Sequence, residues 1–229
     1  TKIPRWAFEK FPGAEEQLTT HMKSVGEAMA IGRTFKESLQ KAIRSLEIAR
    51  FGLGADGAGG RYDDLSLDAL LDLIERPHPD RLFELRAAFM RGATVEQLYE
   101  RTMIDPWFLR NLGEIVEMQD SLAKRRPGGA RGPAATDPAD ISEMSRDEML
   151  QYKRAGFSDR QIATLTQATE HDVHKLRREL GVQPVVKLVD TCAAEFKAAT
   201  PYFYLTYEEE DEHRASERSN IIILGGGPN

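Results

Sequence analysis

Helix start signals recur through the middle of this chain and constrain its fold more than any other feature. At four candidate helix starts a Ser or Thr precedes a Glu or Gln by three residues, the pattern of a capping box. These candidate N-caps are Thr34, Thr94, Ser145 and Ser158. Further N-caps are expected at Ser66, Asp80, Asp105 and Thr169. A series of short capped helices predicts a mainly α fold built as an irregular helical bundle.

The segments before and after this region lack helix signals. The first thirty residues, and the chain from Pro184 onward, are expected to be extended or irregular. A helix is expected at about 35 to 48, and the longest one follows Asp105-Pro106. Three segments are expected to be loops. They are the glycine-rich segment 51–61, the Pro/Gly/Ala-rich linker 125–140 and the acidic run 208–212.

Composition limits the class of protein. The 229 residues carry a net charge of −6, which argues against a general nucleic-acid binder. The single cysteine excludes an internal disulfide and fits a reducing, cytoplasmic setting. No apolar run approaches the roughly 18 residues of a membrane span, and the N-terminus has no signal-peptide core. It also lacks a starting Met, so we expect a piece of a longer chain.

Residues 158–180 match the pattern of a helix-turn-helix. Lys175, Arg177 and Arg178 of its second helix are placed to meet DNA phosphates. Acidic residues share that helix and would repel a DNA backbone, so a helical hairpin within a larger bundle is the competing interpretation.

Four other side chains are functional candidates: His171, His174, Cys192 and Glu27. His171 and His174 have helical spacing for one metal ion, but no further ligand is near them in sequence, which favours two surface histidines. Cys192 has no base beside it, which favours a buried structural thiol. Glu27 lies in a small, apolar stretch, so it either lines a polar cavity, pairs with a cation or is a plain surface residue.

The chain ends in IIILGGGPN. Four apolar residues followed by Gly225, Gly226 and Gly227 are typical of a strand that enters a nucleotide-binding turn. A complete fingerprint needs further glycines and a helix. Because an unpaired apolar strand would be an exposed edge, this pattern indicates that more chain follows.

Three stretches together resemble one family closely. They are residues 19–47, residues 185–196 (VVKLVDTCAAEF) and residues 221–229, and the segments IDPWFL and GFSDRQIATLT fit as well. The chain resembles the large subunit of glutamine-dependent carbamoyl phosphate synthetase over essentially its whole length. In that family a helical oligomerization domain lies between two ATP-grasp synthetase halves. The resemblance therefore implies short extended or β flanks from neighbouring ATP-grasp and pre-ATP-grasp domains.

The resemblance also implies boundaries. Residues 1–46 would end the first, carboxyphosphate half, residues 47–212 would form the oligomerization domain, and residues 213–229 would start the second, carbamoyl phosphate half. Glu27 matches an acidic residue associated with the tunnel for carbamate, and Gly225–Gly227 would begin an incomplete nucleotide turn. No catalytic or metal-binding residue falls within the chain.

For the parent protein the resemblance implies an ATP-dependent ligase of arginine and pyrimidine biosynthesis. It would make carbamoyl phosphate from bicarbonate, glutamine-derived ammonia and two ATP, with Mg or Mn and K as cofactors. The expected partners are the rest of the large subunit, a glutaminase small subunit and further copies of the chain, with no nucleic acid or membrane. This chain alone is expected to be inactive, and the DNA-binding alternative loses weight.

Self-association would use apolar helix faces. The candidate residues are Leu82, Leu85, Phe89, Leu98, Trp107, Phe108 and Ile115. Some of them must belong to the core, and the sequence does not divide core from interface.

Overall fold

A computed structural model describes residues 1–57, 61, 62, 64–125, 141–197, 202–213, 221 and 223. Two antiparallel strand pairs flank a body of helices, so the predicted mainly helical fold with short β flanks is confirmed. The elements in chain order are β1 (Lys2–Arg5), the 3-10 helix η1 (Phe8–Lys10), β2 (Gly26–Met29), α1 (Phe35–Ser45), α2 (Leu67–Ile74), α3 (Arg81–Met90), α4 (Val95–Thr102), α5 (Pro106–Ala123), α6 (Arg146–Arg154), α7 (Asp159–Thr166), α8 (Glu170–Glu179), β3 (Val185–Leu188) and β4 (Phe203–Thr206).

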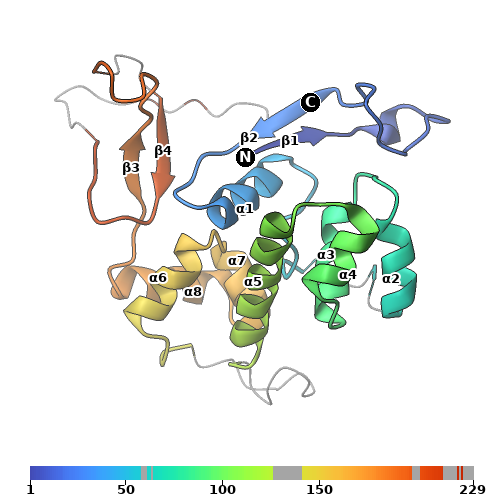
Figure 1. Ribbon diagram of the computed structural model, residues 1–229. Helices are drawn as coiled ribbons and strands as arrows, with labels where there is room; N and C mark the ends of the chain where they lie inside the picture. Colours follow the sequence, from blue (N-terminus) through green and yellow to red (C-terminus); the bar gives the residue numbers. More distant parts are fainter. Residues whose placement is uncertain are drawn as a thin grey trace.

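Helix α5 is the centre of the helical body. It packs against α1, α3, α4 and α7, with α2 to α4 on one side and α6 to α8 on the other (Figure 1). The α5 side chains that enter the core are Leu109, Leu112, Ile115, Val116 and Leu122. Both strand pairs, β1–β2 and β3–β4, lie on the same side of this body (Figure 1). Helix α1 contacts β1 and β2, and β3–β4 lies beside α1, while the residue after β4 also meets α6, because Arg154 donates to the carbonyl of Tyr207 at 2.9 Å.

Most predicted helix starts are confirmed in detail. Reciprocal capping boxes form at Thr94, Ser145, Ser158 and Thr169, because each side-chain oxygen accepts from the third backbone N–H of its helix while that third residue bonds back. Ser66 and Asp105 also cap as expected, and Pro106 occupies the first helical position. Local sequence chemistry is sufficient to fix these ends.

The predicted cap at Asp80 is wrong, and the capping box predicted at Thr34 is only half formed. Asp80 makes no side-chain cap, because its carboxylate accepts from Arg61 at 2.6 Å instead. Thr34 caps the N–H of Glu37, but the Glu37 carboxylate accepts from the N–H of Arg33 at 2.7 Å rather than from Thr34, so the box is not reciprocal. Helix α1 also ends at Ser45, earlier than predicted.

The loop predictions meet different outcomes. Residues 126–140 of the predicted linker and Gly225–Gly227 lie outside the described residues. The acidic run is not simply solvated, because it lies along β3: Glu212 accepts from the N–H of Leu188 at 2.6 Å, and Lys187 contacts both Glu210 and Glu212 at 3.2 Å. Segment 51–57 is not a surface loop, as described below.

Candidate functional site

Helix α1 has one apolar face and one polar edge, and both are used. Leu39, Ala42 and Ile43 pack into the core at 3%, 0% and 0% exposure. Glu37, Ser38 and Gln40 are buried as well, although they are polar. Buried polar groups need hydrogen-bond partners, and the partners here come from distant parts of the chain. We call the polar residues of this helix the α1 junction: Glu37, Ser38, Gln40, Lys41 and Arg44.

The first part of the α1 junction holds the two flanks. The Thr206 hydroxyl, at the end of β4, donates to Glu37 Oε2 at 3.1 Å, and Lys41 donates to the backbone carbonyl of Leu205 in the same strand. On the other side, the Thr1 and Ser38 hydroxyls lie 2.6 Å apart next to β1. One helical turn therefore binds both strand pairs, with Glu37 and Thr206 lying 169 residues apart in the sequence.

The second part is a buried glutamine network, formed by Gln40, Gln119 and Gln161. Gln40 donates to the carbonyl of Ala155 at 2.8 Å, and its own Oε1 accepts from Gln161 Nε2 at 2.9 Å. All three side chains are at most 2% exposed. Because their hydrogen bonds run between α1, α5 and α7, the network joins the halves of the helical body.

This network also explains why segment 51–57 is buried. Leu53 donates its N–H to Gln40 at 3.3 Å and its carbonyl accepts from Gln119 at 2.7 Å, while the Gly54 carbonyl accepts from Gln161 at 2.9 Å. The backbone at Gly54 has φ +72, and an added Cβ would lie 2.5 Å from the Arg86 side chain. Gly54 therefore serves close packing rather than flexibility.

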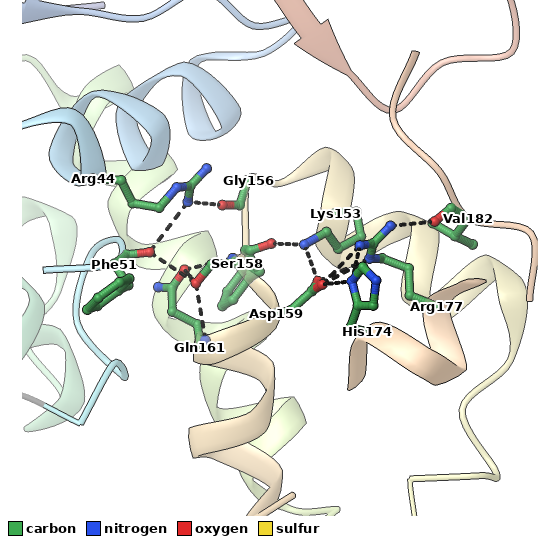
Figure 2. Close-up of polar contacts among 11 residues, drawn as sticks. Arg44, Phe51, Lys153, Gly156, Ser158, Asp159, Gln161, His174, Arg177 and Val182 are labelled. Atoms are coloured by element: carbon green, nitrogen blue, oxygen red, sulfur yellow. Dashed lines mark hydrogen bonds and ion pairs between the residues drawn. The ribbon is translucent and has the colours of Figure 1, made fainter. Parts of the chain in front are cut away.

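A buried ionic cluster surrounds Asp159 at the start of α7. Figure 2 shows Lys153 and Arg177 converging on its carboxylate: Lys153 Nζ lies 2.7 Å from Oδ1, and Arg177 donates from two nitrogens at 3.0–3.2 Å. Lys153 also donates to the Phe157 carbonyl at 2.7 Å. Burial lowers the pKa of Lys153 to about 8, against the opposing pull of Asp159. The cluster fixes α6 and α8 around the first turn of α7.

This cluster corrects the helix-turn-helix interpretation. Arg177, which was expected to meet phosphates, is 8% exposed and bound to Asp159 and to the Val182 carbonyl. It packs the hairpin of α7 and α8 instead of facing solvent.

The remaining single candidates lie at the surface. His171 and His174 are exposed, as predicted, and His174 Nδ1 lies 3.5 Å from Asp159. Within the described ranges, no group of three or more His, Cys, Asp or Glu side chains could hold a metal ion. Cys192 is half-buried in a turn after β3, so the prediction of a buried thiol is wrong. Glu27 is exposed on β2 and pairs with Lys2 at 2.8 Å.

The structure divides the apolar interface candidates. Leu85, Leu98 and Ile115 are fully buried in the core, and Leu82 and Phe89 are partly buried against it. Trp107 and Phe108 are instead 48% and 44% exposed at the start of α5. Their rings lie 4.9 Å apart between centroids, and each lies 5.2 Å from the ring of Phe35. We call these three residues the aromatic patch.

Sequence reasoning missed the glutamine network and Arg44. A weak signal exists in the positions themselves, because Gln40 follows Leu39 and precedes Ala42-Ile43 on the apolar side of a helix. Spacing of this kind indicates burial of the glutamine but not its partners, of which Ala155 and Gln161 lie more than one hundred residues away.

A model of one protein family, described as "Carbamoyl-phosphate synthetase large chain, oligomerisation domain", matches residues 27–181. The chain belongs to this family. The match covers α1 to α8, which is the helical body together with its junction helix. It gives the helix-turn-helix segment a place inside the family's helical domain, and nothing found supports the DNA-binding alternative.

Relatives of the family align with the whole chain. A carbamoyl phosphate synthase large chain of a Nostoc species is 51% identical over 229 residues, and that of Archaeoglobus fulgidus is 44% identical over 228 residues. The arginine-specific large chain of Arabidopsis thaliana, a chloroplastic protein, is 45% identical over 229 residues. Each alignment covers 100% of this chain but only 18–20% of the relative. The chain thus spans about a fifth of the length of these relatives.

No helix among the described residues is long and apolar enough to cross a membrane.

Proposed function

We propose that this chain is the oligomerization and connector region of a carbamoyl phosphate synthetase large chain. The supporting observation is its identity of 44–51%, end to end, with relatives that carry this name. The parent protein would be a cytoplasmic, ATP-dependent ligase that forms carbamoyl phosphate from bicarbonate, glutamine-derived ammonia and two ATP. The use of Mg or Mn and K, and a glutaminase small subunit as partner, belong to the same proposal and concern parts of the parent outside this chain.

The connector role rests on the α1 junction. Helix α1 hydrogen-bonds to Thr1 and to Thr206, the last residue of β4. Residues 1–46 and 213–229 would belong to the two synthetase halves, with 47–212 between them, so the bond between Glu37 and Thr206 would attach the first half to the connector. Glu27 would line the carbamate tunnel, which fits its exposure on β2, because a neighbouring domain can cover it. Gly225–Gly227 would open the nucleotide fold of the second half.

The test uses the parent large chain with its small subunit. We expect ammonia-dependent carbamoyl phosphate synthesis from the parent and none from the 229 residues alone. Replacing Glu37 with Met in the parent should lower overall synthesis more than either partial ATPase reaction, because it removes the hydrogen bond that attaches the first half to the connector and leaves both active sites unchanged. If the 229 residues alone turn over ATP with bicarbonate, the proposal fails.

Self-association would use the aromatic patch. A cluster of three packed rings that is half exposed resembles the aromatic anchor of an interface. We expect Trp107→Lys to reduce the mass of the assembly measured by light scattering. Met90→Lys is the matched control, because Met90 is 44% exposed at the end of α3. An unchanged mass in Trp107→Lys, with lost synthesis in the parent, would assign the patch to contact with a synthetase half instead.

A further inference from the structure

A cavity of about 230 Å³ opens at the α1 junction, away from the aromatic patch. Arg44 lines it from α1, Lys153 from α6, and Tyr207 from the residue that follows β4. Figure 2 shows Arg44 and Lys153 approaching the turn between α6 and α7 from opposite sides. Three separately anchored elements therefore meet at one small, polar space.

Arg44 has no counter-ion in the described part of the chain. Its Nη1 donates to the carbonyls of Gly156 at 2.7 Å and Phe51 at 3.4 Å, and neither Nε nor Nη2 reaches a described acceptor. Burial lowers the pKa of the Arg44 guanidinium, which is the direction expected for a cation that has lost water without gaining an anion. Unused guanidinium donors at a cavity wall suit an oxyanion.

Tyr207 and Lys153 line the same space. The Tyr207 hydroxyl makes no hydrogen bond to any described residue. Burial raises its pKa to about 12, with smaller effects from the nearby charges of Arg177, Asp159 and Arg44, so the hydroxyl keeps its proton at neutral pH. The Lys153 ammonium donates to Phe157 and Asp159 and lies 5.3 Å from the centroid of the Tyr207 ring, so it is already engaged. The cavity therefore offers a guanidinium and a phenol as donors.

The acids of the cavity do not cancel this preference. Glu37 is matched by Lys41 at 2.6 Å, and Asp159 is shared between Lys153 and Arg177. The remaining lining acid is Glu170, an exposed residue at the start of α8. It lies at the rim and would weaken an anion's approach without filling the site.

We propose that this cavity binds a small tetrahedral oxyanion, held by the Arg44 guanidinium and the Tyr207 hydroxyl. The volume suits an ion such as inorganic phosphate and excludes a nucleotide, since ligand pockets for drug-sized molecules run to roughly 300–1,000 Å³. The bound anion connects α1 to the segment after β4, so it stabilises the attachment of the C-terminal flank. The proposal does not depend on the parent's activity.

The experiment titrates the purified chain with sodium phosphate at constant ionic strength, by calorimetry and by thermal unfolding. Tyr207→Phe removes the unpaired hydroxyl and keeps the ring, so it should leave unfolding unchanged without phosphate and weaken phosphate binding about tenfold. Glu170→Gln should tighten binding about threefold. Glu179→Gln is its control, because Glu179 is exposed at the other end of α8 and does not line the cavity.

The outcomes separate specific binding from general salt effects. Sulfate should stabilise the chain as phosphate does, and acetate and chloride should not. Equal stabilisation by chloride would overturn the proposal, because screening alone would explain it. Phosphate affinity that is the same in wild type and Tyr207→Phe, or no binding heat in the wild type, would also overturn it.

Discussion

Replacing Gln40 with Met tests how strongly the glutamine network holds the helical body. Methionine keeps the length and approximate shape of the side chain but cannot take part in the network. The substitution leaves three buried groups without partners: the Ala155 carbonyl, the Leu53 N–H and one N–H of Gln161. All are inaccessible to bulk water in the folded chain, since Gln40 itself is 0% exposed.

The magnitude follows from these three groups. Each buried donor or acceptor that loses its partner costs about 1–3 kcal/mol, and the added apolar burial of Met returns about 1–2 kcal/mol. The free energy of unfolding should therefore fall by about 4–5 kcal/mol, a large part of the 5–15 kcal/mol typical of a domain. With a urea dependence of about 2–3 kcal/mol/M, the unfolding midpoint should move down by about 2 M.

Urea unfolding followed by circular dichroism measures this shift. Gln151→Met is the control, because Gln151 is exposed on α6 and its side chain has no described partner, so its midpoint should stay within about 0.2 M of wild type. A double variant with Gln161→Met should lose less than the sum of the single variants, because their shared hydrogen bond is lost only once. A loss of unfolding free energy below about 1 kcal/mol for Gln40→Met would show that water satisfies the network's polar groups and that the network does not hold segment 51–57 in place.

Three further predictions concern single residues. The pKa of Lys153 is about 8 in the folded chain and 10.5 ordinarily, so between these pH values the unfolded chain binds one more proton than the folded chain. The free energy of unfolding of the wild type, measured in urea melts relative to Lys153→Met, should therefore rise with pH by about 1 kcal/mol from pH 7 to 9. Gly54→Ala should destabilise the chain by at least about 1 kcal/mol more than Gly57→Ala. Both glycines have positive φ, but only at Gly54 would an added Cβ meet side-chain atoms. Equal losses of unfolding free energy in the two variants would refute the close contact between Gly54 and Arg86. Asp159→Asn should cost about 3–5 kcal/mol by leaving two buried cations unpaired, whereas Asp147→Asn, at a side chain 94% exposed, should unfold like wild type.

Local chemistry explains which parts of the fold the sequence predicts. The caps at Thr94, Ser145 and Ser158 depend on residues within one helical turn, so the local sequence pattern is sufficient to predict them. Asp80 fails as a cap because Arg61, nineteen residues earlier, competes for its carboxylate. Glu37 departs from its pattern because its carboxylate serves Lys41 and Thr206 as well as the backbone.

Long-range contacts explain the rest. Segment 51–57 has the composition of a flexible loop, yet its backbone groups are satisfied by glutamines from α1, α5 and α7. The division of apolar helix residues into core and aromatic patch depends on how α5 is rotated against its neighbours, which periodicity leaves open for Trp107 and Phe108. The family, by contrast, is recognisable from long stretches of the sequence because identity does not require knowledge of contacts.

Hydrogen exchange on the variant Glu37→Met/Ser38→Ala tests most directly whether α1 attaches both flanks to the helical body. We predict that backbone amides of β1–β2 and of β3–β4 exchange faster than in wild type, because the contacts to Thr1 and Thr206 are lost together. Amides of α2 and α3 should keep their wild-type rates, since these helices make no contact with the changed groups. Unchanged protection in both strand pairs would contradict the role of α1 as the connector.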